Sequence, residues 1–127
     1  MNAILSIKPR FIAEIVAGNK RFEFRKSVFK RPVEKVYVYA SAPICRIIGE
    51  FQAVDVITGA PGDVWKETNK FSGIPKEFFD EYYRGRKTAF AIVIQNFVNY
   101  EHPLNLPKGL RAPQNYCYVE SIEQKSR

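Results

Sequence analysis

Cysteine and histidine are scarce in this sequence of 127 residues, which holds two cysteines and one histidine. Cys45 and Cys117 lie far apart in apolar surroundings and form neither a disulfide framework nor a CxxC zinc cluster, so we expect two buried free thiols in a reducing compartment. His102 is expected in a turn, and a single histidine argues against a histidine-based ribonuclease mechanism. No Ser-His-Asp triad can be assembled either. The sequence therefore predicts no metal site and no cofactor.

Long apolar runs are also absent. The longest uninterrupted one extends from Ala89 to Ile94, far below the roughly 20 residues that a membrane-spanning helix needs. The first residues, Met1 to Lys8, have neither the basic start nor the apolar core of a signal peptide. We therefore expect a cytoplasmic protein without a membrane partner.

The composition is that of a folded domain with a basic excess. Apolar residues make up 46% and charged residues 26%, which is typical of globular proteins. The length fits one domain, which we expect over residues 1–122, followed by a polar C-terminal tail at residues 123–127. Lysine and arginine number 20 against 13 acidic residues, and the formal net charge of +7 favours attraction to phosphates.

Apolar periodicity and turn residues predict an α+β protein. Apolar residues at helical spacing, followed by Gly18, predict a helix over residues 9–17, and two more short helices are expected at 63–70 and 75–84. Strands are expected at residues 3–7, 20–26, 35–41, 46–58 (one long strand or a bent pair), 87–97 and, as a strand or short helix, 116–122. An irregular return is expected over residues 103–110. Five or six strands with three inserted helices favour a small mixed β-barrel over a doubly wound parallel sheet.

The segment after the first expected helix carries a set of charges that can perform chemistry. Glu23 and Arg25 lie two apart on a strand and share the face opposite two phenylalanines. Lys20 has the other parity, but it lies in the turn after Gly18, where strand parity does not yet apply. A Lys–Glu–Arg set can hold a carboxylate in place and leave cationic donors for a phosphate or a polarised carbonyl. The alternative is a solvated strand face with a weak Arg–Glu pair.

The spacing GxKxxExR, met by Gly18, Lys20, Glu23 and Arg25, resembles the signature of the ASCH domain family in the PUA-like superfamily. Four further segments resemble successive parts of that family in order: residues 4–27, 35–43, 47–51 and 111–119. The resemblance implies a compact β-barrel with short helices at its ends and a cleft lined by the signature residues. It also implies binding of RNA or nucleotides in translation, RNA processing or transcription coactivation.

Some members of the family resemble enzymes, namely amidohydrolases of N4-acetylcytidine and proposed ribonucleases. In the amidohydrolase branch the motif lysine activates a threonine three residues later, and Glu23 occupies that position here. A carboxylate cannot make the same alkoxide attack. An enzyme of this kind would therefore use Lys20 and Glu23 as an acid–base pair, with Glu23 activating a water or orienting the two cations.

Cations and aromatic residues around the motif suggest where a ligand would bind. Tyr39 and Ser41 share a strand face and are expected to line the cleft with Lys20, Glu23 and Arg25. Tyr39, Trp65, Tyr116 and Tyr118 could stack on bases, or simply pack in the core. The other cations of the first quarter of the chain predict a nucleic-acid surface, with a merely solubilising surface as the alternative: Lys8, Arg10, Arg21, Lys26, Lys30 and Arg31.

Three functions remain open from the sequence. The first is a module that binds RNA or a modified nucleotide through Lys20, Glu23 and Arg25. The second is a small hydrolase of N4-acylated cytidine or RNA that uses Lys20 and Glu23. The third is an adaptor whose basic surface contacts a protein partner in the ribosome or the transcription machinery.

Overall fold

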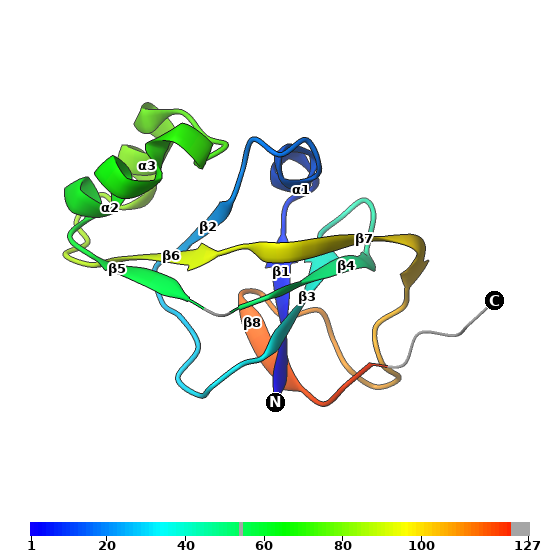
Figure 1. Cartoon of the computed structure of the whole chain (residues 1–127). Coiled ribbons are helices and arrows are strands. Elements are labelled where there is room, and N and C mark those ends of the chain that lie inside the picture. The colour runs from blue at the N-terminus through cyan, green and yellow to red at the C-terminus, as the bar shows by residue number, and fades with distance from the viewer. Residues whose placement is uncertain (54, 123–127) are drawn as a thin grey trace.

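A computed structural model describes residues 1–53 and 55–122 and shows two β-sheets with helices beside them (Figure 1). The larger sheet has the strand order β7-β4-β3-β1-β8, with β1 (Asn2–Ile7), β3 (Lys35–Ala40), β4 (Arg46–Gln52), β7 (Gln95–Leu104) and β8 (Tyr116–Val119). The smaller sheet has the order β2-β6-β5, with β2 (Phe22–Arg25), β5 (Val56–Gly59) and β6 (Ala89–Val93). β1 and β3 pair in parallel, and the other paired strands of the two sheets are antiparallel.

The chain passes between the two sheets four times, and two of these passages fall within segments expected as single strands. The expected strand over residues 46–58 is a bent pair, because β4 belongs to the larger sheet and β5 to the smaller one. The expectation of one strand over residues 87–97 was wrong, since β6 ends at Val93 and β7 begins in the other sheet at Gln95. At this junction the Ile94 N–H donates to the Arg21 carbonyl at 2.9 Å, and Asn96 takes a positive φ of 53°. β7 then continues to Leu104, so the first part of the expected irregular return is a strand.

The helices cover the sheets from one side and frame the region between them. Helix α1 (Pro9–Val16) joins β1 to β2 and buries Ile12 and Ile15 against the strands, as its apolar spacing predicted. Between β5 and β6 the chain inserts α2 (Pro61–Thr68), a short 3₁₀ helix η1 (Asn69–Phe71) and α3 (Lys76–Tyr82). α3 buries Phe79 in a cluster with Phe24 of β2 and Ala91 of β6, which seats the insertion on the smaller sheet.

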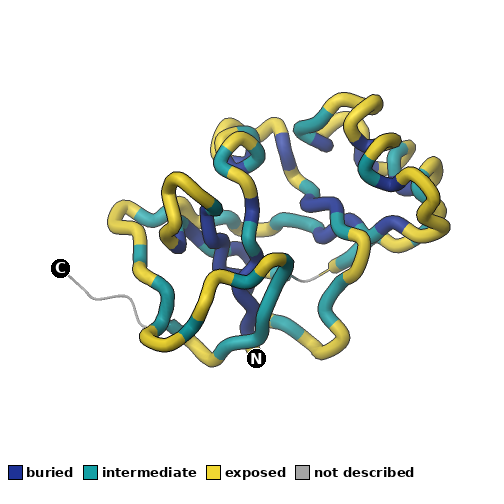
Figure 2. The backbone as a smooth tube through the Cα atoms, turned by 180° about the vertical axis from the view of Figure 1, so that it is seen from behind, coloured by how far each residue is buried: buried dark blue, intermediate teal, exposed yellow. Residues whose placement is uncertain are grey.

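The core follows the strands. Figure 2 shows the buried residues gathered in the central strands, whereas the turns and the outer faces of the helices are exposed. β3 is buried over nearly its whole length, because one face packs on the α1 side and the other on a separate cluster with β4 and β7. That burial on both faces is why its residues are almost all apolar or aromatic.

The α+β, barrel-like architecture is confirmed, with eight strands in the described residues rather than five or six. Two expectations about individual residues were wrong. Cys45 is exposed rather than buried, because it lies in the turn that joins β3 to β4, while Cys117 is partly buried. His102 is exposed and belongs to β7 rather than to a turn. The described helices are all too short to cross a membrane, and the expected tail at residues 123–127 lies outside the described part of the chain.

Candidate functional site

Lys20 is held under the insertion that follows β5. Gly18 (φ 85°) lets the chain turn at the end of α1, and Lys20 then forms an isolated β-bridge with Ser72. The Lys20 Nζ donates to the Ser72 carbonyl at 3.1 Å and lies 3.6 Å from the Glu23 Oε1. Gly73 packs on the lysine stem so closely that a Cβ there would lie 2.5 Å from the Lys20 Cβ. Backbone from a distant segment therefore fixes the position of this ammonium.

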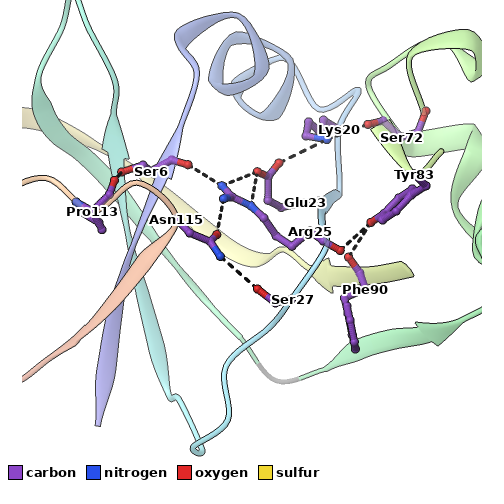
Figure 3. Close-up of polar contacts among 10 residues, drawn as sticks. All are labelled: Ser6, Lys20, Glu23, Arg25, Ser27, Ser72, Tyr83, Phe90, Pro113 and Asn115. Atoms are coloured by element: carbon purple, nitrogen blue, oxygen red, sulfur yellow. Dashed lines mark hydrogen bonds and ion pairs between the residues drawn. The ribbon is translucent and has the colours of Figure 1, made fainter. Parts of the chain in front are cut away.

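Glu23 is shared between the two cations of the motif (Figure 3). Its Oε2 accepts from the Arg25 Nε at 3.1 Å and lies 2.9 Å from the Arg25 Nη2. The exposed fractions of the three side chains are only 2% for Lys20, 7% for Glu23 and 12% for Arg25. This burial excludes the alternative of a solvated strand face with a weak ion pair.

The Arg25 guanidinium is occupied by the protein on all its nitrogens. Besides Glu23, its Nη1 donates to the Asn115 Oδ1 at 2.7 Å and its Nη2 donates to the Ser6 carbonyl. Asn115 in turn donates to the Ser27 hydroxyl at 3.3 Å (Figure 3). Arg25 thus joins β1, β2 and the segment before β8, and its main effect is to hold the Glu23 carboxylate in place.

Burial lowers the pKa of Lys20 from its ordinary value, and the adjacent Glu23 carboxylate only partly opposes this. The ammonium also lies 4.8 Å from the centre of the Phe24 ring and 5.5 Å from that of Phe11, which stabilises the charged form. An ammonium has three donors. The Ser72 carbonyl and Glu23 take two of them, so the third can donate to a ligand.

These groups form the floor of a cavity of about 290 Å³. Its walls are aromatic and come from two helices: Phe11 of α1, and Phe78 and Tyr82 of α3. Polar side chains complete the lining at several points: Ser6, Lys8, Ser41 and Gln114. A mainly apolar cavity with a few convergent polar groups is the usual form of a small-molecule or cofactor site.

The sequence did not assign the α3 residues of this cavity to the ligand site. The sequence predicts that the four aromatics at residues 78, 79, 82 and 83 share one side of a helix, and this spacing does not indicate which of them face a ligand. Phe79 and Tyr83 enter the core, while Phe78 and Tyr82 face the cavity. Burial raises the pKa of Tyr82, against the opposing charge of Arg25, so its hydroxyl stays protonated and can donate.

The structure brings together some of the predicted ligand residues and not others. Ser41 lines the cavity beside Lys20, but Tyr39 is buried in the cluster on the opposite face of the larger sheet and does not line it. The shared strand face assumed for these two residues ends with β3 at Ala40, where the Ser41 N–H donates to the Ile7 carbonyl. Trp65 and Tyr116 pack on Phe79 and Phe29, as the packing alternative expected.

The predicted surface cations fall into two groups. Three lie at the cavity: Lys8 lines it, and Arg10 and Lys26 stack on aromatic rings of its wall. The other three lie away from the lining: Arg21 stacks on Phe71, Arg31 stacks on Tyr118, and the backbone N–H of Lys30 donates to the Tyr118 hydroxyl. A ligand in the cavity would meet only the first group.

Comparison with known proteins gives one family match and several similar chains. The model of the ASCH domain family matches residues 5–101. A protein of Zymomonas mobilis named ASCH domain-containing ribonuclease is 20% identical over 127 residues, which cover 95% of this chain and 86% of that one. The crystal structure of ASCH from Zymomonas mobilis superposes with a TM-score of 0.84 at 22% identity, covering 94% of this chain and 87% of that chain.

Other relatives are much longer than this chain. The large ribosomal subunit protein uL22 of Ureaplasma parvum is 30% identical over 103 residues, which cover 80% of this chain but 33% of that protein. The chain therefore spans about a third of the length of the first curated relatives that it matches.

Proposed function

Because this chain belongs to the ASCH domain family, we propose that its cavity binds RNA or a nucleotide, with one unpaired base held over Lys20 and Glu23. The observation that carries this proposal is a buried ammonium at the floor of an aromatic-walled cavity, with a third N–H available to a ligand. Lys20 can donate to a carbonyl or ring nitrogen of a base, and Glu23 can accept from a neighbouring N–H or amino group. Aromatic walls suit the faces of a base whichever base it is.

Direct binding of short single-stranded RNA at two salt concentrations tests this function. Lys20→Met removes the ligand donor while keeping an apolar stem of similar length, and we expect it to weaken binding by at least tenfold. Lys70→Met is the matched control, because Lys70 is exposed on η1 and does not line the cavity. Equal binding by wild type and Lys20→Met would contradict the assignment, and so would failure of the wild type to bind any of the RNAs.

We infer a second candidate function, RNA hydrolysis, from the same pair of residues. A lysine with a lowered pKa next to a buried carboxylate is the kind of pair that transfers protons, and a relative over most of this chain is named a ribonuclease. Hydrolysis of N4-acetylcytidine, with Glu23 activating a water, is the variant of this hypothesis suggested by the amidohydrolase branch. Both variants predict that Lys20→Met abolishes turnover.

Assays of RNA cleavage and of acetylcytidine deacetylation, with and without divalent metal, separate these functions. Product that appears with wild type and is lost in Lys20→Met supports hydrolysis. Binding without product in any condition supports the binding module alone.

Within either function we propose that residues 1–122 act as one domain in the cytoplasm. A contact with the ribosome or the transcription machinery, proposed from the basic surface, would be supported by a pull-down that survives nuclease treatment.

A further inference from the structure

Charge divides the cavity into a floor and a rim. On the floor the Glu23 carboxylate lies within 3.6 Å of the Lys20 ammonium, and the Arg25 nitrogens are all engaged by the protein. A phosphate placed there would face a buried carboxylate, which repels it. A neutral base edge, with a donor beside an acceptor, matches this pair of groups. The floor therefore suits a base, and phosphates must bind elsewhere.

Two cation–aromatic pairs mark the rim, one on each end of the α3 wall. The Arg10 guanidinium lies 5.5 Å from the Phe78 ring centre and 4.8 Å from that of Phe11. The Lys26 ammonium lies 4.7 Å from the ring centre of Tyr82. Phe78 and Tyr82 are four residues apart on α3, which places them on one face at a separation of about 6 Å along the helix axis.

The pair on the α1 side has a second cation close by. Lys8 lines the cavity itself and lies two residues before Arg10 in the chain. The described structure thus places cations at both ends of the α3 wall of the cavity: Lys8 and Arg10 at the Phe78 end, and Lys26 at the Tyr82 end.

We propose that the cavity holds an internal nucleotide of a single-stranded RNA, with one flanking phosphate bound by Lys8 and Arg10 and the other by Lys26. This rests on the proposed nucleotide-binding function and makes its substrate a chain rather than a free nucleoside. A nucleoside would reach the floor but leave the cations at both ends of the wall unused. A trinucleoside diphosphate is the shortest ligand whose middle nucleotide has a phosphate on each side.

The test measures the affinity of the whole chain for a nucleoside, the matching dinucleotide NpN and trinucleotide NpNpN at 50 and 200 mM salt. Each phosphate contact with a single strand contributes about −0.7 to the slope of log K against log salt. We therefore expect the trinucleotide to lose affinity about sevenfold over this range. Either rim variant, Lys8→Gln with Arg10→Gln or Lys26→Gln alone, should reduce that loss to about 2.6-fold. Lys66→Gln with Lys108→Gln, two exposed lysines outside the lining, is the charge-matched control and should behave as wild type.

The outcomes separate the two claims. If the nucleoside binds as tightly as the trinucleotide and both rim variants behave as the control, the chain-binding proposal is wrong, while sensitivity to Lys20→Met keeps the nucleotide site. If one rim variant alone changes the salt dependence, the ligand is a terminal rather than an internal nucleotide, which also overturns the proposal. If Lys20→Met leaves every affinity unchanged, the nucleotide site itself is wrong.

Discussion

Removal of the Arg25 side chain should destabilise the protein strongly, because this guanidinium holds the buried Glu23 carboxylate. Arg25→Ala would leave Glu23 with Lys20 at 3.6 Å and remove the donor that reaches the Asn115 Oδ1 at 2.7 Å. Breaking a buried ion pair by deleting one partner costs about 3–5 kcal/mol, a large part of the roughly 5–15 kcal/mol that stabilises a domain. Arg25→Lys keeps the charge but loses the forked geometry, and we expect a smaller loss of about 1.5–3 kcal/mol.

Urea unfolding followed by the fluorescence of Trp65 measures these free energies, since this residue packs on Phe79 with ring centres 4.8 Å apart. Arg21→Ala is the matched control: Arg21 is exposed, stacks on Phe71, and should cost about 1 kcal/mol or less. If Arg25→Ala does not fold, Arg25→Lys carries the comparison. Midpoints of both Arg25 variants equal to that of Arg21→Ala would refute a positioning role and make Arg25 available as a ligand contact.

The remaining predictions concern the cavity. Because burial lowers the pKa of Lys20, RNA binding should weaken with rising pH before an ordinary lysine loses its proton. Lys20→Arg should extend binding to higher pH, and measurement of RNA affinity as a function of pH checks both expectations. At pH values between the lowered pKa of Lys20 in the folded protein and its ordinary value of 10.5, the unfolded chain binds more protons at Lys20 than the folded protein does. The contribution of Lys20 to the free energy of unfolding should therefore rise with pH in this range, and urea midpoints measured against pH would show it. Gly73→Ala should destabilise the protein by more than the roughly 1–2 kcal/mol that an alanine in the left-handed region costs, and it should also weaken RNA binding by displacing Lys20. Gly85→Ala is the control, because Gly85 has a similar φ but open space around it and should show only the backbone strain. Equal effects of the two variants on stability and on binding would contradict the packing of Gly73 on Lys20. Tyr82→Leu should reduce the RNA-binding free energy by about 1–3 kcal/mol through lost stacking, as measured by calorimetry. Phe71→Leu is the control and should leave the binding free energy unchanged, because Phe71 does not line the cavity. Equal losses in the two variants would place the RNA elsewhere.

Local spacing predicted the convergence of the three charged side chains on the floor as one of two alternatives, beside a solvated strand face. Glu23 and Arg25 share a strand face, and Gly18 places Lys20 in the turn before that strand, so the three side chains converge as expected. The order of strands and helices along the chain could also be predicted, since turn residues separate the apolar segments. Apolar spacing could not show where β6 ends and β7 begins, because the chain changes sheets there without a glycine or proline.

The walls and the support of the site depend on contacts that are remote in the sequence. Ser72 and Asn115 meet the motif from positions 52 and 90 residues away, through pairing that no local pattern indicates. Phe78 and Tyr82 could be predicted to share one side of a helix, but their spacing does not show that they line a cavity rather than pack in the core. Tyr39 was assigned to the cleft by strand parity, which tells which residues share a face but not which face lies toward the ligand.

The crystal structure of the protein with a bound RNA trinucleotide tests the central claim most directly. We predict a base against the wall formed by Phe78 and Tyr82, with a polar edge atom within hydrogen-bond distance of the Lys20 Nζ. One phosphate should lie near Lys8 and Arg10, and another near Lys26. RNA bound on another face, with this cavity free of any base, would contradict it.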